Sequence, residues 1–301
     1  MPRAAVIGGG LMGHGIAQVL ALGGIDVVVH DPVPEALAAV PARIAANLQA
    51  LGIDADMHVE LETELEAAAR DADWVFEAAP EDLELKQQIF GRLDAVTRPE
   101  AILATNTSVM RVRDVAAQAE KRARIVGTHW WNPPFLVPLV EVVQGPDTDP
   151  ATIDRTMAFL GSLGKTPVHV RRDVAGFVGN RLQHALWREA FDLVDKGVCD
   201  AETIDTVIKA GFGRRLPALG PMENADLVGL DLTLAIHEYV LPELDPPSQP
   251  SDGLRRRVQR GELGMKTGAG FRRWSERDAD EVRGRVVARL TAANEENGVA
   301  R

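Results

Sequence analysis

The strongest constraint on this chain is a glycine-rich turn close to its start. The apolar run Ala4–Ile7 leads directly into Gly8–Gly13, which has the spacing G-x-G-x-x-G. At the junction of a strand and a helix, the first glycine permits a tight turn and the second lets the backbone approach a pyrophosphate. The third lets the helix pack against the strand. This arrangement predicts a dinucleotide site. The residues expected to contact the cofactor here are Gly8, Gly10, Leu11, Met12 and Gly13.

An acidic residue follows at the spacing that such a site needs. The apolar run Val27–His30 is typical of a second strand, and Asp31 comes directly after it. In dinucleotide-binding units, an acidic residue roughly 20 positions beyond the turn accepts hydrogen bonds from the ribose 2′-hydroxyl. A carboxylate there repels a 2′-phosphate, and residues 32–35 contain no Lys or Arg to bind one. The sequence therefore favours NAD over NADP.

The rest of the chain divides into two regions with different patterns. Its 301 residues suffice for two domains. Up to about residue 173, short apolar runs alternate with helical patterns, which is typical of βαβ units and a parallel sheet. Beyond that point only helical patterns remain. We therefore expect an α/β fold, with a Rossmann-type doubly wound sheet in residues 1–173 and an all-helical substrate and dimerisation domain in residues 174–301.

The expected elements can be stated by residue range. Strands are predicted at Ala4–Ile7, Val27–His30, Trp74–Ala78, Ile102–Ala104, Ile125–Thr128, Leu139–Val143 and Pro167–Val170. Helices of the first domain are predicted at Leu11–Leu22, Glu35–Leu51, Leu83–Thr97 and Ala151–Leu163. Helices of the second domain are predicted at Phe177–Lys196, Ala201–Ala210, Pro221–Tyr239 and Asp278–Asn294.

Composition argues against several classes of protein. The net charge is −11, whereas a nucleic-acid-binding face needs clustered Lys and Arg. The sequence has no apolar run of about 18 residues that could cross a membrane. The single cysteine, Cys199, cannot form an intramolecular disulfide, which favours a cytoplasmic location. The histidines show no metal-ligand spacing, so no metal site is expected. These features argue against nucleic-acid and membrane partners.

Three polar residues interrupt or follow predicted strands. Ser108 lies just beyond the strand at 102–104, and His129 comes directly after the strand at 125–128. Ligands of open α/β sheets bind beyond the carboxyl ends of strands, so both residues are expected near the cofactor. Glu141 lies inside an apolar strand, where a carboxylate needs a polar partner. A His129–Glu141 pair would form a general base with a fixed tautomer. The alternative is a histidine that is hydrogen-bonded in the core without a catalytic role.

The sequence resembles the L-3-hydroxyacyl-CoA dehydrogenase family over nearly its whole length. The matching motifs, in order, are Val6–Ala17, Glu81–Lys86, Thr105–Ser108, His129–Pro133, Leu139–Val142, Gly176–Arg181 and Lys266–Phe271. The resemblance implies an NAD-dependent oxidoreductase that converts a 3-hydroxyl group to a 3-oxo group. It also implies a homodimer formed through the helical domain, where two predicted helices carry more apolar side chains than a small domain can bury. An internal core is the alternative use of those side chains.

The resemblance also implies a role for individual residues. His129 would take the proton of the substrate hydroxyl, and Glu141 would orient and charge-balance it. Ser108 and Asn180 would hydrogen-bond the substrate oxygens. The implied cofactor contacts beyond the glycine turn are Asp31, Glu81, Lys86, Asn106 and Lys266. Without the resemblance, Glu81 and Lys86 would be interpreted as a solvated charge pair at a helix start, and Asn180 as a polar residue at a helix end.

The segment after the second strand leaves the substrate open between an acyl-CoA and a free 3-hydroxy acid. Family members that act on acyl-CoA carry basic residues there, whereas residues 44–69 contain no Lys or Arg. A phosphate-rich ligand would instead meet like charge, which weakens binding. The acidic residues of this segment are Asp54, Asp56, Glu60, Glu62, Glu64 and Glu66.

Two further departures point to the free acid. Trp130-Trp131 stand where the family has Phe-Phe, and Pro134 follows the motif His129–Pro133. This pattern is more similar to the branch of the family that contains gulonate dehydrogenase and lambda-crystallin. Arg214 and Arg215 are candidates to pair with a substrate carboxylate, and solvated loop charges are the alternative. A non-catalytic, crystallin-like NAD-binding protein is a further alternative. The complete set of four catalytic candidates favours an enzyme.

Overall fold

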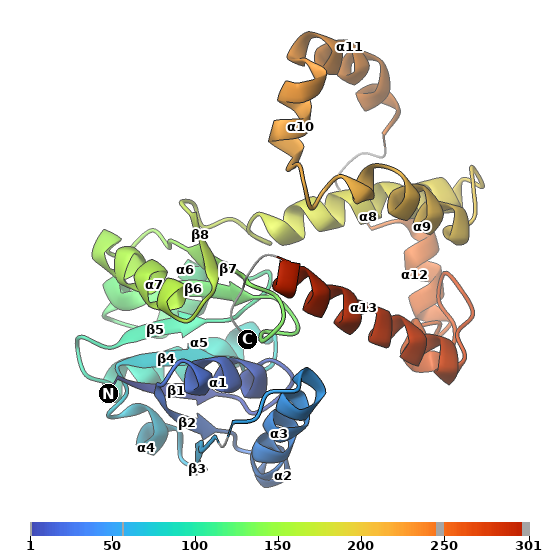
Figure 1. The fold of residues 1–301 in the computed structure, drawn as a ribbon. Coiled ribbons are helices and arrows are strands. Elements are labelled where there is room, and N and C mark those ends of the chain that lie inside the picture. The colour runs from blue at the N-terminus through green and yellow to red at the C-terminus, as the bar shows by residue number, and fades with distance from the viewer. Residues whose placement is uncertain (1, 56, 245–249, 297–301) are drawn as a thin grey trace. The chain divides into compact units, whose positions relative to one another are not determined.

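The computed structural model describes residues 2–55, 57–244 and 250–296, so Asp56 of the acidic segment lies outside the described residues. The chain forms two compact units, residues 1–181 with 286–301, and residues 182–285. The first unit contains the whole sheet, and the second is built from helices (Figure 1). Residues 174–181 and the end of the last helix belong to the first unit. The domain boundary expected at residue 173 stays a prediction.

Eight strands form one sheet in the order β3-β2-β1-β4-β5-β6-β7-β8. Their bounds are β1 Arg3–Ile7, β2 Asp26–His30, β3 Glu60–Glu62, β4 Trp74–Glu77, β5 Ile102–Thr105, β6 Ile125–Trp130, β7 Leu139–Val143 and β8 Thr166–Val170. The first six strands have the order typical of a Rossmann sheet. The α/β, doubly wound fold predicted from the sequence is therefore confirmed.

Helices cover both faces of this sheet (Figure 1). One buried apolar cluster joins one face to α1, α3 and α7, and a second cluster joins the other face to α4, α5 and α6. The α-helices that lie between β1 and β8 in the sequence are α1 Gly13–Leu22, α2 Pro34–Ala38, α3 Val40–Leu51, α4 Leu65–Ala69, α5 Leu83–Val96, α6 Val112–Val115 and α7 Pro150–Ser162. This layering leaves the carboxyl ends of the parallel strands free at one edge, where the cofactor binds in such sheets.

The sheet differs from the prediction in two strands. β3 was not predicted, because Glu60–Glu62 is a short, exposed edge strand without an apolar pattern. β7 was predicted as part of a parallel sheet but runs antiparallel to β6, while all other neighbouring pairs are parallel. The connection between β6 and β7 contains no helix among its residues, and a parallel crossover usually needs one.

Two predicted helices are each divided in the structure. The helix expected at Glu35–Leu51 becomes α2 and α3, which meet at Ala39 just before Pro41. Proline lacks a backbone N–H and fits only the first turn of a helix, so a new helix begins there. The helix expected at Pro221–Tyr239 is divided at Gly229, whose φ of 102° is outside the helical region.

The C-terminal part of the described chain contains no regular strand after Val170. Its helices are α8 Gly179–Asp195, α9 Ala201–Ala210, α10 Pro221–Val228, α11 Leu230–Val240, α12 Asp252–Gln259 and α13 Glu276–Glu296. The helix α12 was not predicted. Helices α8 to α11 bury none of their side chains fully within this chain. Large apolar side chains such as Leu227 and Leu230 are more than 60% exposed, at 72% and 63%.

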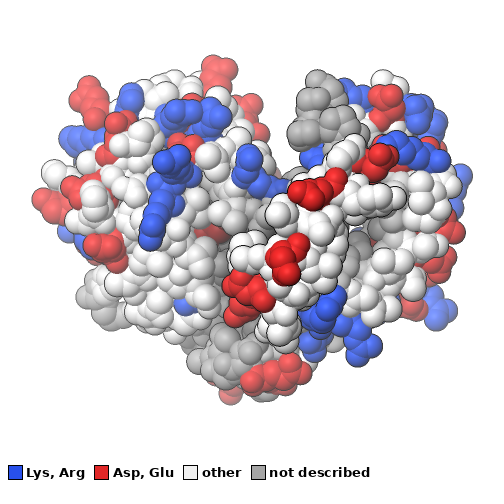
Figure 2. Space-filling view, turned by 90° about the horizontal axis from the view of Figure 1, so that it is seen from above, with Lys and Arg blue, Asp and Glu red and all other residues white. Residues whose placement is uncertain are grey.

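The surface carries both signs of charge. On the face seen in Figure 2, acidic and basic side chains are interspersed. Among the described helices, none is both long and apolar enough to cross a bilayer.

Candidate active site

The glycine turn joins β1 to α1 and has room for a ligand at one defined point. Gly8 has a φ of +109°, and a Cβ there would lie 2.6 Å from the Ala78 carbonyl oxygen. A Cβ on Gly13 would lie 1.7 Å from the Gly8 carbonyl oxygen. A Cβ on Gly10, by contrast, would have no heavy atom within 4 Å. The outer glycines thus serve the fold, and the open space at Gly10 fits the close approach of a dinucleotide pyrophosphate.

Asp31 lies directly beyond β2 and is held against this turn. Its Oδ2 accepts a hydrogen bond from Gly9 N at 2.8 Å, and its Oδ1 accepts one from Val33 N at 2.9 Å. The carboxylate therefore has a fixed position beside the glycine turn, as a ribose-binding residue requires. Arg43 of α3 also reaches the turn, because its Nη1 donates to Gly9 O at 3.0 Å. Arg43 lies outside residues 32–35, and its contact with the turn was not predicted.

His129 and Glu141 face each other across the antiparallel pair β6–β7. The two residues are direct partners in the strand register, and His129 Nδ1 lies 2.8 Å from Glu141 Oε2. Both side chains are buried. Glu141 Oε1 also accepts hydrogen bonds from Val178 N at 2.9 Å and Gly179 N at 3.0 Å. The expected contact between His129 and Glu141 is present.

The surroundings of Glu141 favour its charged form. Burial acts to raise the pKa of Glu141, but hydrogen bonds from His129 and from the Gly179 and Val178 amides outweigh it, so the pKa lies below its usual value. An ionised carboxylate can only accept a hydrogen bond, so His129 Nδ1 carries the proton. His129 Nε2 is then left with a free lone pair. This tautomer is the one that a general base needs.

Ser108 and Asn180 lie together in the first unit. Asn180 Nδ2 donates to the Ser108 carbonyl oxygen at 2.8 Å, which ties the start of α8 to the segment after β5. The Ser108 side chain is exposed, and Asn180 is half-buried. Asn106 has a structural contact, because its Oδ1 accepts a hydrogen bond from Trp130 N at 2.9 Å. Asn106 thereby links β5 to the end of β6, next to His129.

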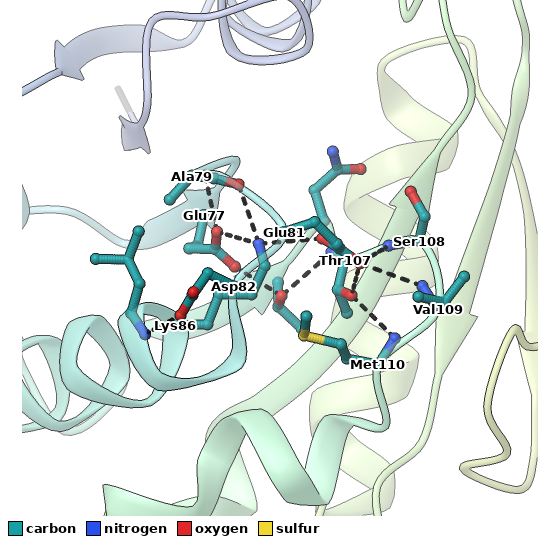
Figure 3. Close-up of polar contacts among 12 residues, drawn as sticks. Glu77, Ala79, Glu81, Asp82, Lys86, Thr107, Ser108, Val109 and Met110 are labelled. Atoms are coloured by element: carbon teal, nitrogen blue, oxygen red, sulfur yellow. Dashed lines mark hydrogen bonds and ion pairs between the residues drawn. The ribbon is translucent and has the colours of Figure 1, made fainter. Parts of the chain in front are cut away.

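A network of charged side chains supports the segment that carries Ser108 (Figure 3). The Lys86 ammonium lies 2.6 Å from Glu77 Oε1 and 3.6 Å from Glu81 Oε2. Glu81 accepts hydrogen bonds from the Thr107 hydroxyl and from Ser108 N, the latter at 3.0 Å. Lys86 is only 1% exposed, so it is not a solvated charge at a helix start. The network therefore connects the end of β4 and the start of α5 to the loop after β5.

Glu77 is the member of this network that the sequence argument missed. Its side chain is fully buried at the end of β4, where Thr105 Oγ1 donates to Oε2 at 2.7 Å and Ala79 N donates to Oε1 at 2.8 Å. Burial raises its pKa, although the Lys86 ammonium and these hydrogen bonds act in the opposite direction. The sequence does contain a signal for Glu77, because a carboxylate at the end of an apolar strand needs a polar partner, as Glu141 does.

Three of the proposed site residues lie in the second unit. Arg214 and Arg215 are at or next to the short 3₁₀ turn Phe212–Arg214, and Lys266 is in the turn Met265–Thr267. All three side chains are exposed. Their roles toward substrate and cofactor stay predictions. Within the described ranges, no group of three or more His, Cys, Asp or Glu side chains could hold a metal ion.

The fold and the site together define an NAD-dependent dehydrogenase. A Rossmann sheet carries a glycine turn with the Asp31 carboxylate held beside it, and a buried histidine–carboxylate pair lies at the same sheet. Family models place this chain more narrowly. The NAD-binding domain of 3-hydroxyacyl-CoA dehydrogenase matches residues 3–174, and the C-terminal domain of the same enzymes matches residues 176–274. The chain belongs to the 3-hydroxyacyl-CoA dehydrogenase family.

Its relatives have different substrates in their names. A 5-formyl-3-hydroxy-2-methylpyridine 4-carboxylate 5-dehydrogenase of Mesorhizobium japonicum is 34% identical and covers 89% of each chain. A probable 3-hydroxybutyryl-CoA dehydrogenase of Deinococcus radiodurans is 38% identical over 88% of this chain and 98% of the relative. An L-carnitine dehydrogenase of Streptomyces griseus is 39% identical over 75% of this chain and 70% of the relative.

Solved structures that are similar to this chain also belong to enzymes named for different substrates. The crystal structure of the pyridine carboxylate 5-dehydrogenase, described as an NAD⁺-dependent dismutase, has a TM-score of 0.91 at 31% identity and covers 98% of both chains. That of the (S)-3-hydroxybutyryl-CoA dehydrogenase PaaH1 from Ralstonia eutropha has a TM-score of 0.75 at 32% identity, over 92% of this chain and 100% of the other. The family thus includes enzymes for acyl-CoA esters and for free acids.

Proposed function

We propose that His129 is the general base of this dehydrogenase and that the reaction oxidises a substrate hydroxyl group to a carbonyl group. The observation that carries this proposal is the buried contact of 2.8 Å between His129 Nδ1 and Glu141 Oε2. Because Glu141 occupies Nδ1, the proton of the substrate hydroxyl goes to His129 Nε2. Glu141 stabilises the imidazolium that results. When bound, NAD supplies the hydride acceptor.

The other proposed site residues orient substrate and cofactor. Ser108 and Asn180 hydrogen-bond the substrate oxygen, and the Glu77–Lys86–Glu81 network holds the Ser108 segment in place. Asp31 binds the adenosine ribose of NAD, with the turn around Gly10 against the pyrophosphate. Glu81 and Lys86 are proposed to act on the ribose and nicotinamide side of the cofactor, and Asn106 and Lys266 are further proposed cofactor contacts. Lys86 reaches that side through Glu81, because its own ammonium is buried against Glu77.

For the substrate, we propose a free hydroxy acid rather than an acyl-CoA ester. The supporting observation is that residues 44–69 offer no cation for the CoA phosphates. The one arginine of α3, Arg43, donates to the glycine turn. The acidic character of this segment is weaker than its sequence suggests, because Glu60 pairs with Arg3 at 2.6 Å and Glu66 with Arg92 at 2.7 Å. Two relatives are also named for substrates that are not CoA esters.

A panel of substrates separates the two candidates. Initial rates of NADH formation or consumption are measured with acetoacetyl-CoA, gulonate, 3-hydroxybutyrate and L-carnitine. We expect kcat/KM to be at least tenfold higher for one of the free acids than for the CoA ester. Faster turnover of acetoacetyl-CoA would refute the free-acid proposal. His129→Ala should abolish turnover of the best substrate while NAD binding persists, which also excludes a non-catalytic NAD-binding protein.

A carboxylate substrate needs a cation, and Arg214 and Arg215 are the proposed partners. Replacing either by Ala should raise KM for the free acid at least tenfold and leave NAD affinity unchanged. Wild-type KM values in both variants would exclude Arg214 and Arg215 as partners of the substrate carboxylate.

We also propose a cytoplasmic homodimer. Apolar side chains on α8, α10 and α11 remain exposed within one chain, and a second copy would cover them. Phe191 of α8, by contrast, is not available for such an interface, because it stacks on Phe271 with ring centroids 4.6 Å apart. Light scattering after gel filtration should give twice the mass of one chain. Leu227→Glu should shift the protein toward a monomer, and a monomeric wild type would exclude the proposal.

A further inference from the structure

A cavity lies within the first unit and shares no residue with the proposed catalytic or cofactor sites. It has a volume of about 480 Å³, which is in the range of small-molecule sites. Its walls are largely apolar and come from α1, the end of α3, the segment 135–138, the end of α7 and the last turn of α13. Side chains that form these walls are Val19, Leu22, Leu51, Phe135 and Leu163.

Gln18 places an unpaired amide in this wall. The residue is fully buried in α1, and its Oε1 accepts a hydrogen bond from Asn47 Nδ2 at 2.9 Å. Its Nε2 has no hydrogen-bond partner among the described residues. A buried polar atom without a partner is costly and uncommon. A ligand in the cavity with an acceptor atom would satisfy this group.

Lys165 places a cation in the same wall. Its ammonium donates to the carbonyl oxygens of Pro134 and Val137, the latter at 3.0 Å, and lies 5.2 Å from the centre of the Trp130 ring. Within the described parts of the chain, no carboxylate forms an ion pair with it. Burial lowers the pKa of Lys165 to about 8. Two of its three N–H groups are used, so one remains for an anion.

The one other charged side chain at this cavity is Glu295, which is exposed on α13. Being exposed, its charge is screened by water much more than that of the half-buried Lys165. The cavity therefore combines apolar walls with a cation that has one N–H group left and an amide donor that has no acceptor. This combination matches a molecule with an aliphatic body and a carboxylate end.

We propose that this cavity is a second ligand site, selective for small aliphatic carboxylates. The carboxylate binds the Lys165 ammonium and the Gln18 amide, and the alkyl chain lies against the apolar walls. This proposal is independent of the substrate proposed above. It also places a ligand next to the segment 134–137, which Lys165 holds and which follows His129 in the sequence.

The experiment measures binding of butyrate, hexanoate and octanoate to the full chain by isothermal titration calorimetry. Each additional buried methylene should strengthen binding about three- to fourfold. Octanamide, which has the same chain without the charge, should bind at least tenfold more weakly than octanoate. Equal affinity along the series, or for the amide, would contradict the proposal, as would the absence of octanoate binding at millimolar concentration.

Variants at position 161 locate the site without removing a polar contact. Gly161 lines the cavity at the end of α7, and a Cβ there would have no heavy atom within 4 Å. Gly161→Phe should fill the cavity and lower octanoate affinity at least tenfold, whereas the matched control Gly161→Ala should stay within twofold of wild type. Lys165→Met should lower affinity for octanoate but not for octanamide. If octanoate binds Gly161→Phe as tightly as wild type, it binds elsewhere, for example at the active site, and the proposal is wrong.

Discussion

The substitution Glu141→Gln tests the proposed base most directly. Glu141 accepts three hydrogen bonds, from His129 Nδ1 and from the Val178 and Gly179 amides, at 2.8–3.0 Å. The introduced amide has nearly the same shape but no charge. If its oxygen stays on the two backbone amides, its NH₂ group faces His129 Nδ1. The imidazole must then carry its proton on Nε2, which leaves no lone pair for the substrate proton.

The expected loss has two parts. A hydrogen bond to a charged partner contributes about 1.5–3 kcal/mol, and each 1.36 kcal/mol corresponds to about tenfold in rate. Loss of the charge alone should therefore lower kcat about 10- to 150-fold. The wrong tautomer adds to this, and in serine proteases the equivalent Asp-to-Asn change costs about 10⁴-fold. We expect a decrease of about 10²- to 10⁴-fold, with little change in NAD affinity.

The assay uses initial rates of NADH formation with the best substrate of the panel, and fluorescence titration for NADH binding. Glu64→Gln, an exposed glutamate at the start of α4, is the matched control and should keep kcat within twofold. A Glu141→Gln enzyme that retains more than a third of the wild-type kcat would refute the reasoning that His129 depends on this carboxylate.

Other predictions concern the cofactor site, the buried network and acid stability. Asp31→Ala should weaken NAD binding at least tenfold and reduce the preference over NADP, measured by titration with each cofactor. Gly10→Ala should keep the folded state but weaken NAD binding, whereas Gly13→Ala should disturb the fold itself, as circular dichroism would show. Glu77→Gln should destabilise the protein by about 3–5 kcal/mol in urea unfolding, because it leaves the buried Lys86 ammonium with only the more distant Glu81 carboxylate, and adding Lys86→Met should recover part of that loss. The lowered pKa of Glu141 stabilises the folded state above the ordinary carboxyl pKa of about 4.5, and this contribution is lost as the pH falls further, so the acid-induced fall in thermal midpoint should be smaller in Glu141→Gln.

Local patterns predicted most of the fold. Apolar runs located seven strands, and the glycine turn with Asp31 predicted NAD as the cofactor. The errors arose where distant residues decide the structure. The direction of β7 depends on its pairing with β6, and the short β3 has charged residues and gains its place by pairing with β2. Pro41 and Gly229 are both residues that interrupt helices and so indicate the two breaks. The apolar pattern continues across both positions, however, and favoured one long helix in each case.

The candidate site was predictable to a similar degree. His129 and Glu141 could be paired from the sequence because a carboxylate in an apolar strand needs a partner. Glu77 could have been found by the same argument. Its partner Lys86 was instead interpreted as a cofactor contact or a solvated charge. The contact of Arg43 with Gly9 and the cavity around Lys165 depend on the packing of α3 and α7, which no local pattern encodes.

The antiparallel direction of β7 relative to β6 determines which insertions and deletions the site can tolerate. Because His129 and Glu141 are cross-strand partners, their contact depends on the strand register and not on the length of the loop between them. Insertions or deletions within residues 131–138 are therefore compatible with catalysis if both strands keep their pairing. A single-residue insertion inside β7 before Glu141 would turn its carboxylate to the opposite face of the sheet. The loop next to His129 is thus free to vary in length, while the strand beside it is not.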